Sequence, residues 1–110
     1  MNKIVRINTE LIVDWDSFHQ VFKMTFGFPE FYGNNMSAWI DCMSYIDDKE
    51  TGMTKIWINE TDTLVIELTN CEAFKKNCLD IYLALLESVA FVNFRKLEAN
   101  GNAMIAIATD

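Results

Sequence analysis

The chain has little positive charge, one histidine and no long apolar run, and each shortage excludes a class of protein. Nine Lys and Arg residues stand against sixteen Asp and Glu, for a formal net charge of −7. Without a basic cluster to neutralise phosphates, we expect no direct binding of nucleic acid. His19 belongs to no cluster of His, Cys and carboxylates at metal-ligand spacing, so we expect neither a metal site nor a cofactor. The longest apolar runs have six residues each, too few for a membrane span or a signal peptide.

The cysteines favour a reducing compartment. Cys42, Cys71 and Cys78 are odd in number and show no CxxC spacing, which fits free thiols better than a disulfide framework. We therefore expect a cytoplasmic protein. The chain has 110 residues, 51% of them hydrophobic, which is enough for one packed core, so residues 1–110 should form a single domain.

Hydrophobic periodicity predicts alternating strands and helices. The expected elements are a strand over 3–8, a helix from Asp14 or Asp16 to Gly27, a helix over 36–48, a hairpin of KIWIN and LVIEL, a short helix from Cys71, a helix over 78–99 and a strand over 103–108. The near-continuous apolarity of LVIEL predicts a strand covered on both faces. This alternation is typical of an α/β sheet with right-handed crossovers.

Residues 29–48 carry the most specific chemistry of the chain. Pro29 and Gly33 predict a turn that leads to Asn34 or Asn35, either of which can cap a following helix. The stretch contains four acidic residues, Glu30, Asp41, Asp47 and Asp48, and no Lys or Arg. We therefore expect the field there to be negative and unneutralised.

The helix predicted over 36–48 has two unlike faces. At about 100° per residue, the core face holds Trp39, Cys42, Met43 and Ile46, the opposite stripe holds Ser37, Asp41, Ser44 and Asp48, and Met36 and Ile40 lie between them. Ser and Asp are mediocre helix formers, and the helix dipole disfavours acidic side chains at the C-terminal end. Two interpretations stay open: a solvated face of an acidic protein, or an acidic surface that docks on a cationic site of another protein.

Several short motifs match one known family. They are Phe18-His19-Gln20, Phe28-Pro29-Glu30-Phe31-Tyr32-Gly33, Asn35, Ala38, Asp41 and Cys42, continued weakly by Val65-Ile66-Glu67 and by Phe94-Arg95 to Gly101. At these positions the chain resembles the barstar family, the small intracellular inhibitors of secreted bacterial ribonucleases. The resemblance covers nearly the whole chain, although only residues 18–42 are specific. It implies a small three-stranded parallel β-sheet with flanking helices, here with an extra hairpin-like insertion before the second strand.

The resemblance also implies a binding site for a basic ribonuclease. It assigns Phe31 to an aromatic contact and Gly33, Asn35 and Met36 to the contact loop and helix start. Asp41 matches the central aspartate that faces the catalytic Arg and His of the nuclease, where a carboxylate imitates the scissile phosphate. With the exposed stripe, the expected partner-binding residues are Phe31, Gly33, Asn35, Met36, Ser37, Ile40, Asp41, Ser44, Tyr45 and Asp48.

Four positions depart from the family pattern. Ser37 replaces a second helix aspartate, Ile40 a tryptophan, Tyr45 a glycine and Lys96 an acidic residue. Whether Asp47 and Asp48 replace the missing acidic contacts is open at this point. We therefore expect a cognate nuclease other than barnase.

The leading hypothesis is an intracellular immunity protein, of the toxin-antitoxin kind, that blocks a cytotoxic ribonuclease. The alternative is a barstar-like interaction or oligomerisation module without nuclease inhibition, in which Met36, Ile40, Tyr45 and KIWIN form an apolar patch. We do not expect an enzyme, because Cys42 faces the predicted core and His19 has no catalytic partner. His19 should instead be a buried, hydrogen-bonded spacer. We expect a monomer, with a homodimer as the open alternative.

Overall fold

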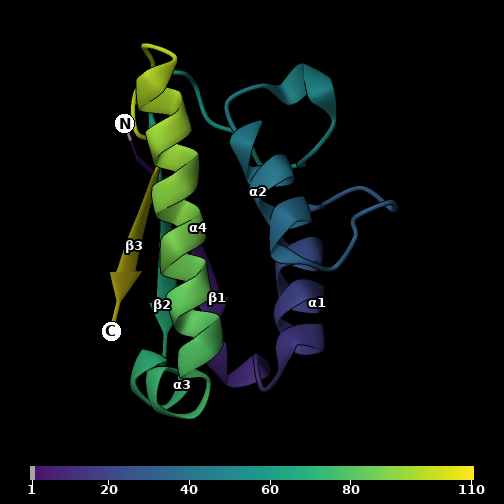
Figure 1. Cartoon of the computed structure of the whole chain (residues 1–110), viewed down its shortest axis with the longest axis vertical. Helices are drawn as coiled ribbons and strands as arrows, with labels where there is room; N and C mark the ends of the chain where they lie inside the picture. The colour runs from purple at the N-terminus through teal and green to yellow at the C-terminus, as the bar shows by residue number, and fades with distance from the viewer. Residues whose placement is uncertain (1) are drawn as a thin grey trace.

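The computed structural model describes residues 2–110, which form a parallel sheet with helices packed against it (Figure 1). The elements are β1 (Asn2–Asn8), the 3-10 turn η1 (Thr9–Leu11), α1 (Trp15–Phe26), α2 (Met36–Ser44), the 3-10 turn η2 (Lys49–Thr51), β2 (Thr63–Thr69), α3 (Cys71–Asn77), α4 (Leu79–Glu98) and β3 (Ile105–Thr109). The strand order is β1-β2-β3, and both pairs are parallel. The predicted α/β fold with a small three-stranded parallel sheet is confirmed.

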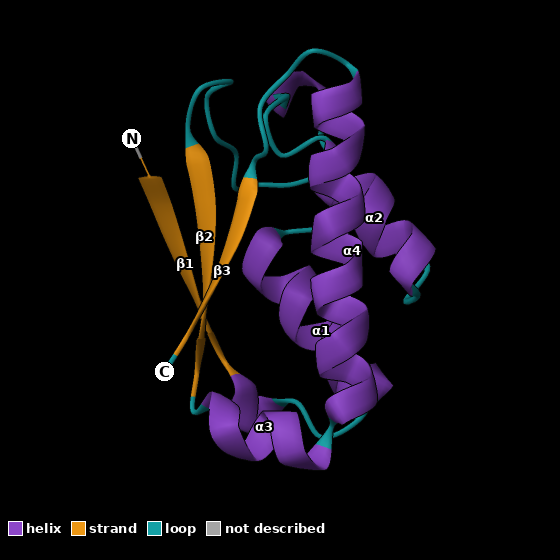
Figure 2. Ribbon diagram, turned by 60° about the vertical axis from the view of Figure 1, so that its left-hand side comes forward, coloured by secondary structure: helices purple, strands orange, loops and turns teal. Residues whose placement is uncertain are grey.

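The helices cover one face of the sheet, and the prediction that β2 is covered on both faces is wrong (Figure 2). Right-handed crossovers that add each strand on the same side place their helices on the same face, and here the strand order follows the chain order. Side chains along β2 alternate accordingly: Leu64, Ile66 and Leu68 are buried, and those between them are half-buried. On the open face, Arg6 of β1 forms a 2.8 Å ion pair with Glu67 of β2.

The core between sheet and helices is rich in aromatic side chains. Phe18, Phe22 and Phe26 of α1 are fully buried, and Trp39 of α2 packs edge-on against Phe22 with ring centroids 5.8 Å apart. Trp15, which the spacing places on the same apolar face, is partly exposed instead. One side of α4 is buried against the same core, namely Ile81, Leu85, Val89 and Val92.

Local capping signals set the ends of the first two helices. Asp14 caps α1: its side chain accepts a 2.8 Å hydrogen bond from the Ser17 N–H, and the Ser17 hydroxyl accepts one from the Asp14 N–H. Gly27 ends α1 at φ +69°, a left-handed conformation that glycine adopts without strain. Of the two candidates for α2, Asn35 is the cap, and its side chain accepts a 2.8 Å hydrogen bond from the N–H three residues on. Asn34 lies at φ +53° in the loop.

The segment between α2 and β2 is not a hairpin, and that prediction is wrong. The Lys55 N–H donates to the carbonyl of Phe26 (2.7 Å), and the Ile58 N–H donates to the carbonyl of Ile46 (2.9 Å). These bonds fasten KIWIN to the end of α1 and to the turn after α2, rather than to β2. Ile58 is buried, so the apolar pattern that suggested a strand anchors a loop to the core. Strand β2 begins at Thr63.

Helix α2 ends at Ser44, four residues before its predicted end. The Tyr45 N–H bonds to the carbonyl of Cys42 and the Ile46 N–H to that of Met43, both at 3.2 Å. This tighter i→i+3 turn closes the helix and brings Ile46 into the core, where it is fully buried. Residues after Ser44 therefore belong to neither of the two faces predicted for a helix over 36–48.

Within residues 2–110, no single helix is long and apolar enough to cross a membrane. Helices α3 and α4 reach the length and apolar composition of a membrane span only when they are taken together, and the chain bends by 107° between them. The same residues contain no group of three or more His, Cys, Asp and Glu side chains that could hold a metal ion. Cys42, Cys71 and Cys78 are free and buried.

Candidate protein-binding site

The loop between α1 and α2 presents Phe31 to solvent. A turn closed by a 2.9 Å hydrogen bond from the Tyr32 N–H to the carbonyl of Pro29 leaves Phe31 77% exposed and Tyr32 buried. Gly33 and Asn35 follow on the exposed side, where the Asn35 amide donates to the carbonyl of Gly33 (3.3 Å). The loop projects from the body of the molecule (Figure 1). An exposed aromatic side chain on a turn that is anchored by its buried neighbour suits a contact with another protein.

A buried pair supports this loop from below. His19 is buried, and its Nδ1 lies 2.5 Å from the hydroxyl of Tyr32. Burial lowers the pKa of His19, which Asp16 opposes to a smaller extent, and burial raises the pKa of Tyr32. Both side chains are therefore neutral near pH 7. The prediction that His19 is a buried, hydrogen-bonded spacer is confirmed.

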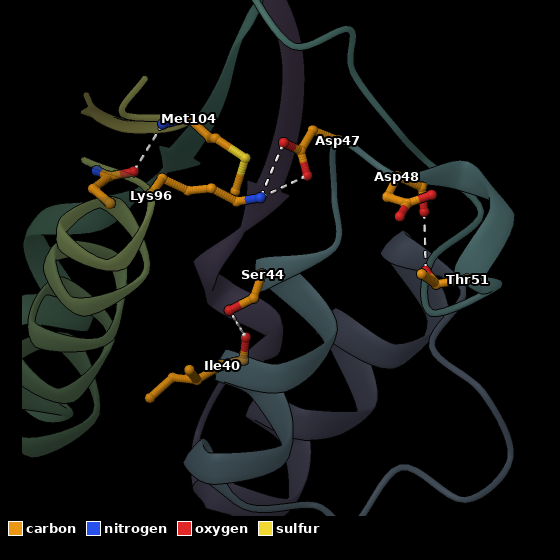
Figure 3. A network of polar contacts seen from close by, with 8 residues as sticks. Ile40, Ser44, Asp47, Asp48, Thr51, Lys96 and Met104 are labelled. Atoms are coloured by element: carbon orange, nitrogen blue, oxygen red, sulfur yellow. Dashed lines mark hydrogen bonds and ion pairs between the residues drawn. The ribbon is translucent and has the colours of Figure 1, made fainter. Parts of the chain in front are cut away.

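Asp41 is the acidic centre of the α2 surface. Its side chain is exposed, and within residues 2–110 it makes no hydrogen bond or ion pair. Ser37, one turn earlier, is also exposed, whereas Ser44 is half-buried and its hydroxyl donates to the carbonyl of Ile40 at 2.6 Å (Figure 3). Met36 and Ile40 are half-buried and pack in part on the core. Of the predicted helical stripe, Asp41 and Ser37 are free to contact a partner.

Asp47 and Asp48 do not extend this acidic stripe. Lys96 of α4 places its Nζ 3.0 and 3.1 Å from the two carboxylate oxygens of Asp47. Asp48 caps η2, since its side chain accepts from the Glu50 N–H (3.2 Å) and its carbonyl from the Thr51 hydroxyl (2.9 Å). Figure 3 shows Asp47 turned to α4 and Asp48 turned away from it. The placement of Asp48 on the stripe is wrong, because the helix ends before it.

Two cations from α4 line a groove together with Asp41. This groove is lined by Asp41, Ser44, Tyr45, Val92, Arg95, Lys96 and Ala99. Lys96 is engaged with Asp47, whereas the guanidinium of Arg95 lies over the ring of Phe91, 5.6 Å from its centroid. The interpretation of an unneutralised acidic surface is therefore wrong at its C-terminal end. The sequence signals are the adjacent basic residues near the end of a helix and the family position of Lys96, but neither shows that Lys96 pairs with Asp47.

A second hollow lies at the start of α2. It is lined by Trp15, His19, Asn34, Asn35 and Met36. The predicted contact residues Asn35 and Met36 thus lie beside Trp15, whose ring stacks on His19 with centroids 5.9 Å apart. The candidate surface runs from this hollow along α2 to Tyr45, which is 45% exposed.

Comparison with known proteins identifies the family. A family model described as Barstar (barnase inhibitor) matches residues 2–104, nearly the whole chain. The chain belongs to the barstar family. No curated protein sequence matches it. A barstar is an inhibitor by description, so the family-level role is inhibition of a ribonuclease rather than catalysis.

The chemistry of Cys42 agrees with the role of a barstar-family protein. Its side chain is buried on the core side of α2. Burial and, to a smaller extent, the neighbouring charge of Asp41 together raise the pKa of the Cys42 thiol to about 11. Near pH 7 the sulfur is therefore a protonated thiol, which is a poor nucleophile.

Proposed function

We propose that this chain blocks the active site of a basic ribonuclease with α2 and the loop before it. The observation that carries the proposal is the state of Asp41, an exposed carboxylate on α2 with no ion-pair partner in residues 2–110. Because its helix is anchored by the buried side chains of Trp39, Cys42 and Met43, the backbone of Asp41 is held in a fixed position. The carboxylate can meet a cationic site without first breaking an internal bond, and it resembles the phosphate that such a site binds in RNA.

The charge of the whole chain supports binding to a basic partner. A net charge of −7 accelerates encounter with a positively charged protein, and the association rate should fall steeply as salt rises. We further propose that the encounter takes place in the cytoplasm of the cell that makes the nuclease. The free state of the three buried thiols supports a reducing compartment.

The geometry favours a cognate nuclease other than barnase. Asp47 forms an ion pair with Lys96, and Asp48 caps η2. Neither is available to replace the two acidic contacts that are missing because Ser37 and Lys96 stand at acidic positions of the family pattern. The partner should therefore present fewer cations outside the pocket that receives Asp41.

The alternative, a module that associates through an apolar patch on α2 and KIWIN, has less support. Met36 and Ile40 pack in part on the core, and Ile58 is buried. Trp57 remains 41% exposed, but Lys3 and Lys49 lie over its ring at 5.8 and 4.9 Å. The apolar surface that remains exposed is smaller than the patch that the sequence suggested.

The test is capture of the partner from the source cell, followed by inhibition of RNA hydrolysis by the purified nuclease. Asp41→Ala should weaken the complex by at least about 2 kcal/mol, or about 30-fold, as expected for a central desolvated anchor. Glu72→Ala on α3, at the opposite end of the molecule from the C-terminal end of α2, is the matched control, because it removes the same charge. Asp41→Ala should speed dissociation, whereas Glu72→Ala should leave the dissociation rate unchanged.

Two results would count against the proposal. A loss below about 0.5 kcal/mol for Asp41→Ala would reject Asp41 as the anchor, since central hot spots lie well above that value. A captured nuclease that keeps its full activity at saturating concentrations of the chain would reject inhibition itself.

A further inference from the structure

The groove between α2 and α4 holds one unpaired charge of each sign. The two helices pack side by side (Figure 1), and Asp41 lines the groove from α2 while Arg95 and Lys96 line it from α4. Lys96 is already bound in its ion pair with Asp47. Arg95 is exposed, and within residues 2–110 its guanidinium forms neither an ion pair nor a hydrogen bond. Asp41 and Arg95 therefore carry opposite charges in one groove without contacting each other.

The contact that Arg95 does make leaves its hydrogen-bond donors free. Its guanidinium lies over the ring of Phe91, 5.6 Å from the centroid. A contact with the face of an aromatic ring uses the charge of a guanidinium, whereas the N–H groups of the guanidinium lie in its own plane and remain available. These N–H groups match the two oxygens of a carboxylate, with which arginine forms bidentate hydrogen bonds.

The chain itself supplies no carboxylate to Arg95. Among the residues that line the groove, Asp41 is the only acidic one, and it forms no ion pair with Arg95. Glu98, about one turn further along α4, is exposed and is not bonded to Arg95 either. The carboxylate of Asp47 is bonded to Lys96. An anion that pairs with Arg95 has to come from another molecule.

We propose that the ribonuclease partner presents an Asp or Glu side chain to Arg95, next to the cationic site that receives Asp41. This inference rests on the proposed inhibition. Both side chains line one groove of about 210 Å³, so a nuclease that covers Asp41 also removes Arg95 from water. A guanidinium buried without a carboxylate is strongly unfavourable, and a cation of the nuclease at this place would be repelled. The groove therefore fits a partner that has a cation opposite α2 and an anion opposite α4.

Arg95 would then determine which nuclease the chain accepts. Asp41 attracts any cationic site that binds phosphate, but Arg95 rejects a nuclease whose cations continue across the groove, because specificity comes from repulsion of the wrong partner as well as attraction of the right one. The anchor and the selecting residue lie on different helices, so each can be changed without altering the helix that carries the other.

The test measures binding of the nuclease that the parent chain captures, after that nuclease has been purified. Arg95→Ala should weaken the complex at least about tenfold, mainly through faster dissociation, and Arg95→Glu should weaken it further. Lys76→Ala is the matched control, because it removes the same charge from an exposed side chain on α3, at the other end of α4. It should leave the dissociation rate unchanged. If Arg95→Ala binds as tightly as the parent, or more tightly because Arg95 competes for Asp41, the inference is overturned.

An exchange of charges across the interface identifies the carboxylate. Each Asp and Glu near the cationic site of the nuclease would be replaced by Lys, with binding rather than RNA hydrolysis as the measurement. One of these nuclease variants should bind the parent chain at least about tenfold more weakly, and Arg95→Glu should restore its binding. If none behaves in this way, Arg95 faces no carboxylate in the complex.

These results are distinguishable from a failure of the proposed function. A nuclease that stays fully active at saturating concentrations of the parent chain rejects inhibition, and the inference about Arg95 falls with it. Inhibition by the parent chain that no substitution of Arg95 weakens rejects the inference alone.

Discussion

The ion pair between Asp47 and Lys96 should stabilise the fold by linking the turn after α2 to α4. The Lys96 Nζ contacts both carboxylate oxygens at 3.0 and 3.1 Å, and the side chains of Lys96 and Asp47 are 28% and 17% exposed. Exposed ion pairs contribute about 0.2–1 kcal/mol, whereas breaking a buried pair costs about 3–5 kcal/mol. For this intermediate burial we expect Asp47→Ala to lower the free energy of unfolding by about 1.5–2 kcal/mol.

A double-mutant cycle isolates the interaction from other effects of each substitution. The free energy of unfolding of the parent, Asp47→Ala, Lys96→Ala and the double variant would be measured in urea, at a protein concentration where the chain is monomeric. The coupling energy should be about 1 kcal/mol. The control cycle uses Arg6 and Glu67, which also form an ion pair (2.8 Å) but with side chains 69% and 29% exposed, so its coupling should stay below about 0.5 kcal/mol. If the Asp47–Lys96 coupling is no larger than the Arg6–Glu67 coupling, burial of the pair does not strengthen it and the reasoning fails.

Two further perturbations test the supports of the loop between α1 and α2. Burial lowers the pKa of His19 in the folded chain. At pH values below the ordinary histidine pKa of about 6.5, the unfolded chain therefore binds a proton at His19 that the folded chain does not. The free energy of unfolding should fall as the pH drops from 7 towards 5. In urea titrations, His19→Gln should flatten that part of the profile whatever its effect on stability at pH 7; an unchanged slope would show that His19 is not its source. Gly27 and Gly52 have nearly equal φ angles of +69° and +68°, but a Cβ on Gly27 would lie 2.7 Å from the Cβ of Lys55, while one on Gly52 would meet open space. Gly52→Ala should therefore cost about 1 kcal/mol for the left-handed backbone, and Gly27→Ala at least about 1 kcal/mol more for the clash; equal losses would show that the KIWIN loop moves aside.

Features determined by neighbouring residues could be predicted from the sequence. Each cap was predicted to within two candidates, of which the structure has Asp14 and Asn35, and the stop at Gly27 is as predicted, because these features depend on hydrogen bonds within a few residues. The buried side of α4 could also be predicted, because the spacing of the apolar residues along it is a property of a single helix.

Features determined by distant contacts could not be predicted. The end of α2 depends on the burial of Ile46 and on Lys96, which is 49 residues from Asp47 in the chain. The KIWIN segment resembles a strand in composition, but its N–H groups bond to Phe26 and Ile46. The charge of the candidate site could not be predicted for the same reason, since the cations near its C-terminal end come from α4, whose position against α2 no local pattern reveals.

Lys96 links the stability of the fold to the charge of the candidate binding surface. The family pattern has an acidic residue at this position, and by that resemblance the carboxylate would face the nuclease. In this chain the lysine bonds to Asp47 and so removes two acidic groups from the surface, the one it replaces and the one it pairs with. Lys96→Glu would add negative charge to the groove, but it would also place a carboxylate beside the half-buried Asp47 and destabilise the turn after α2. The two effects cannot be separated by changing Lys96 alone, so a gain of acidity at this position requires that Asp47 change as well.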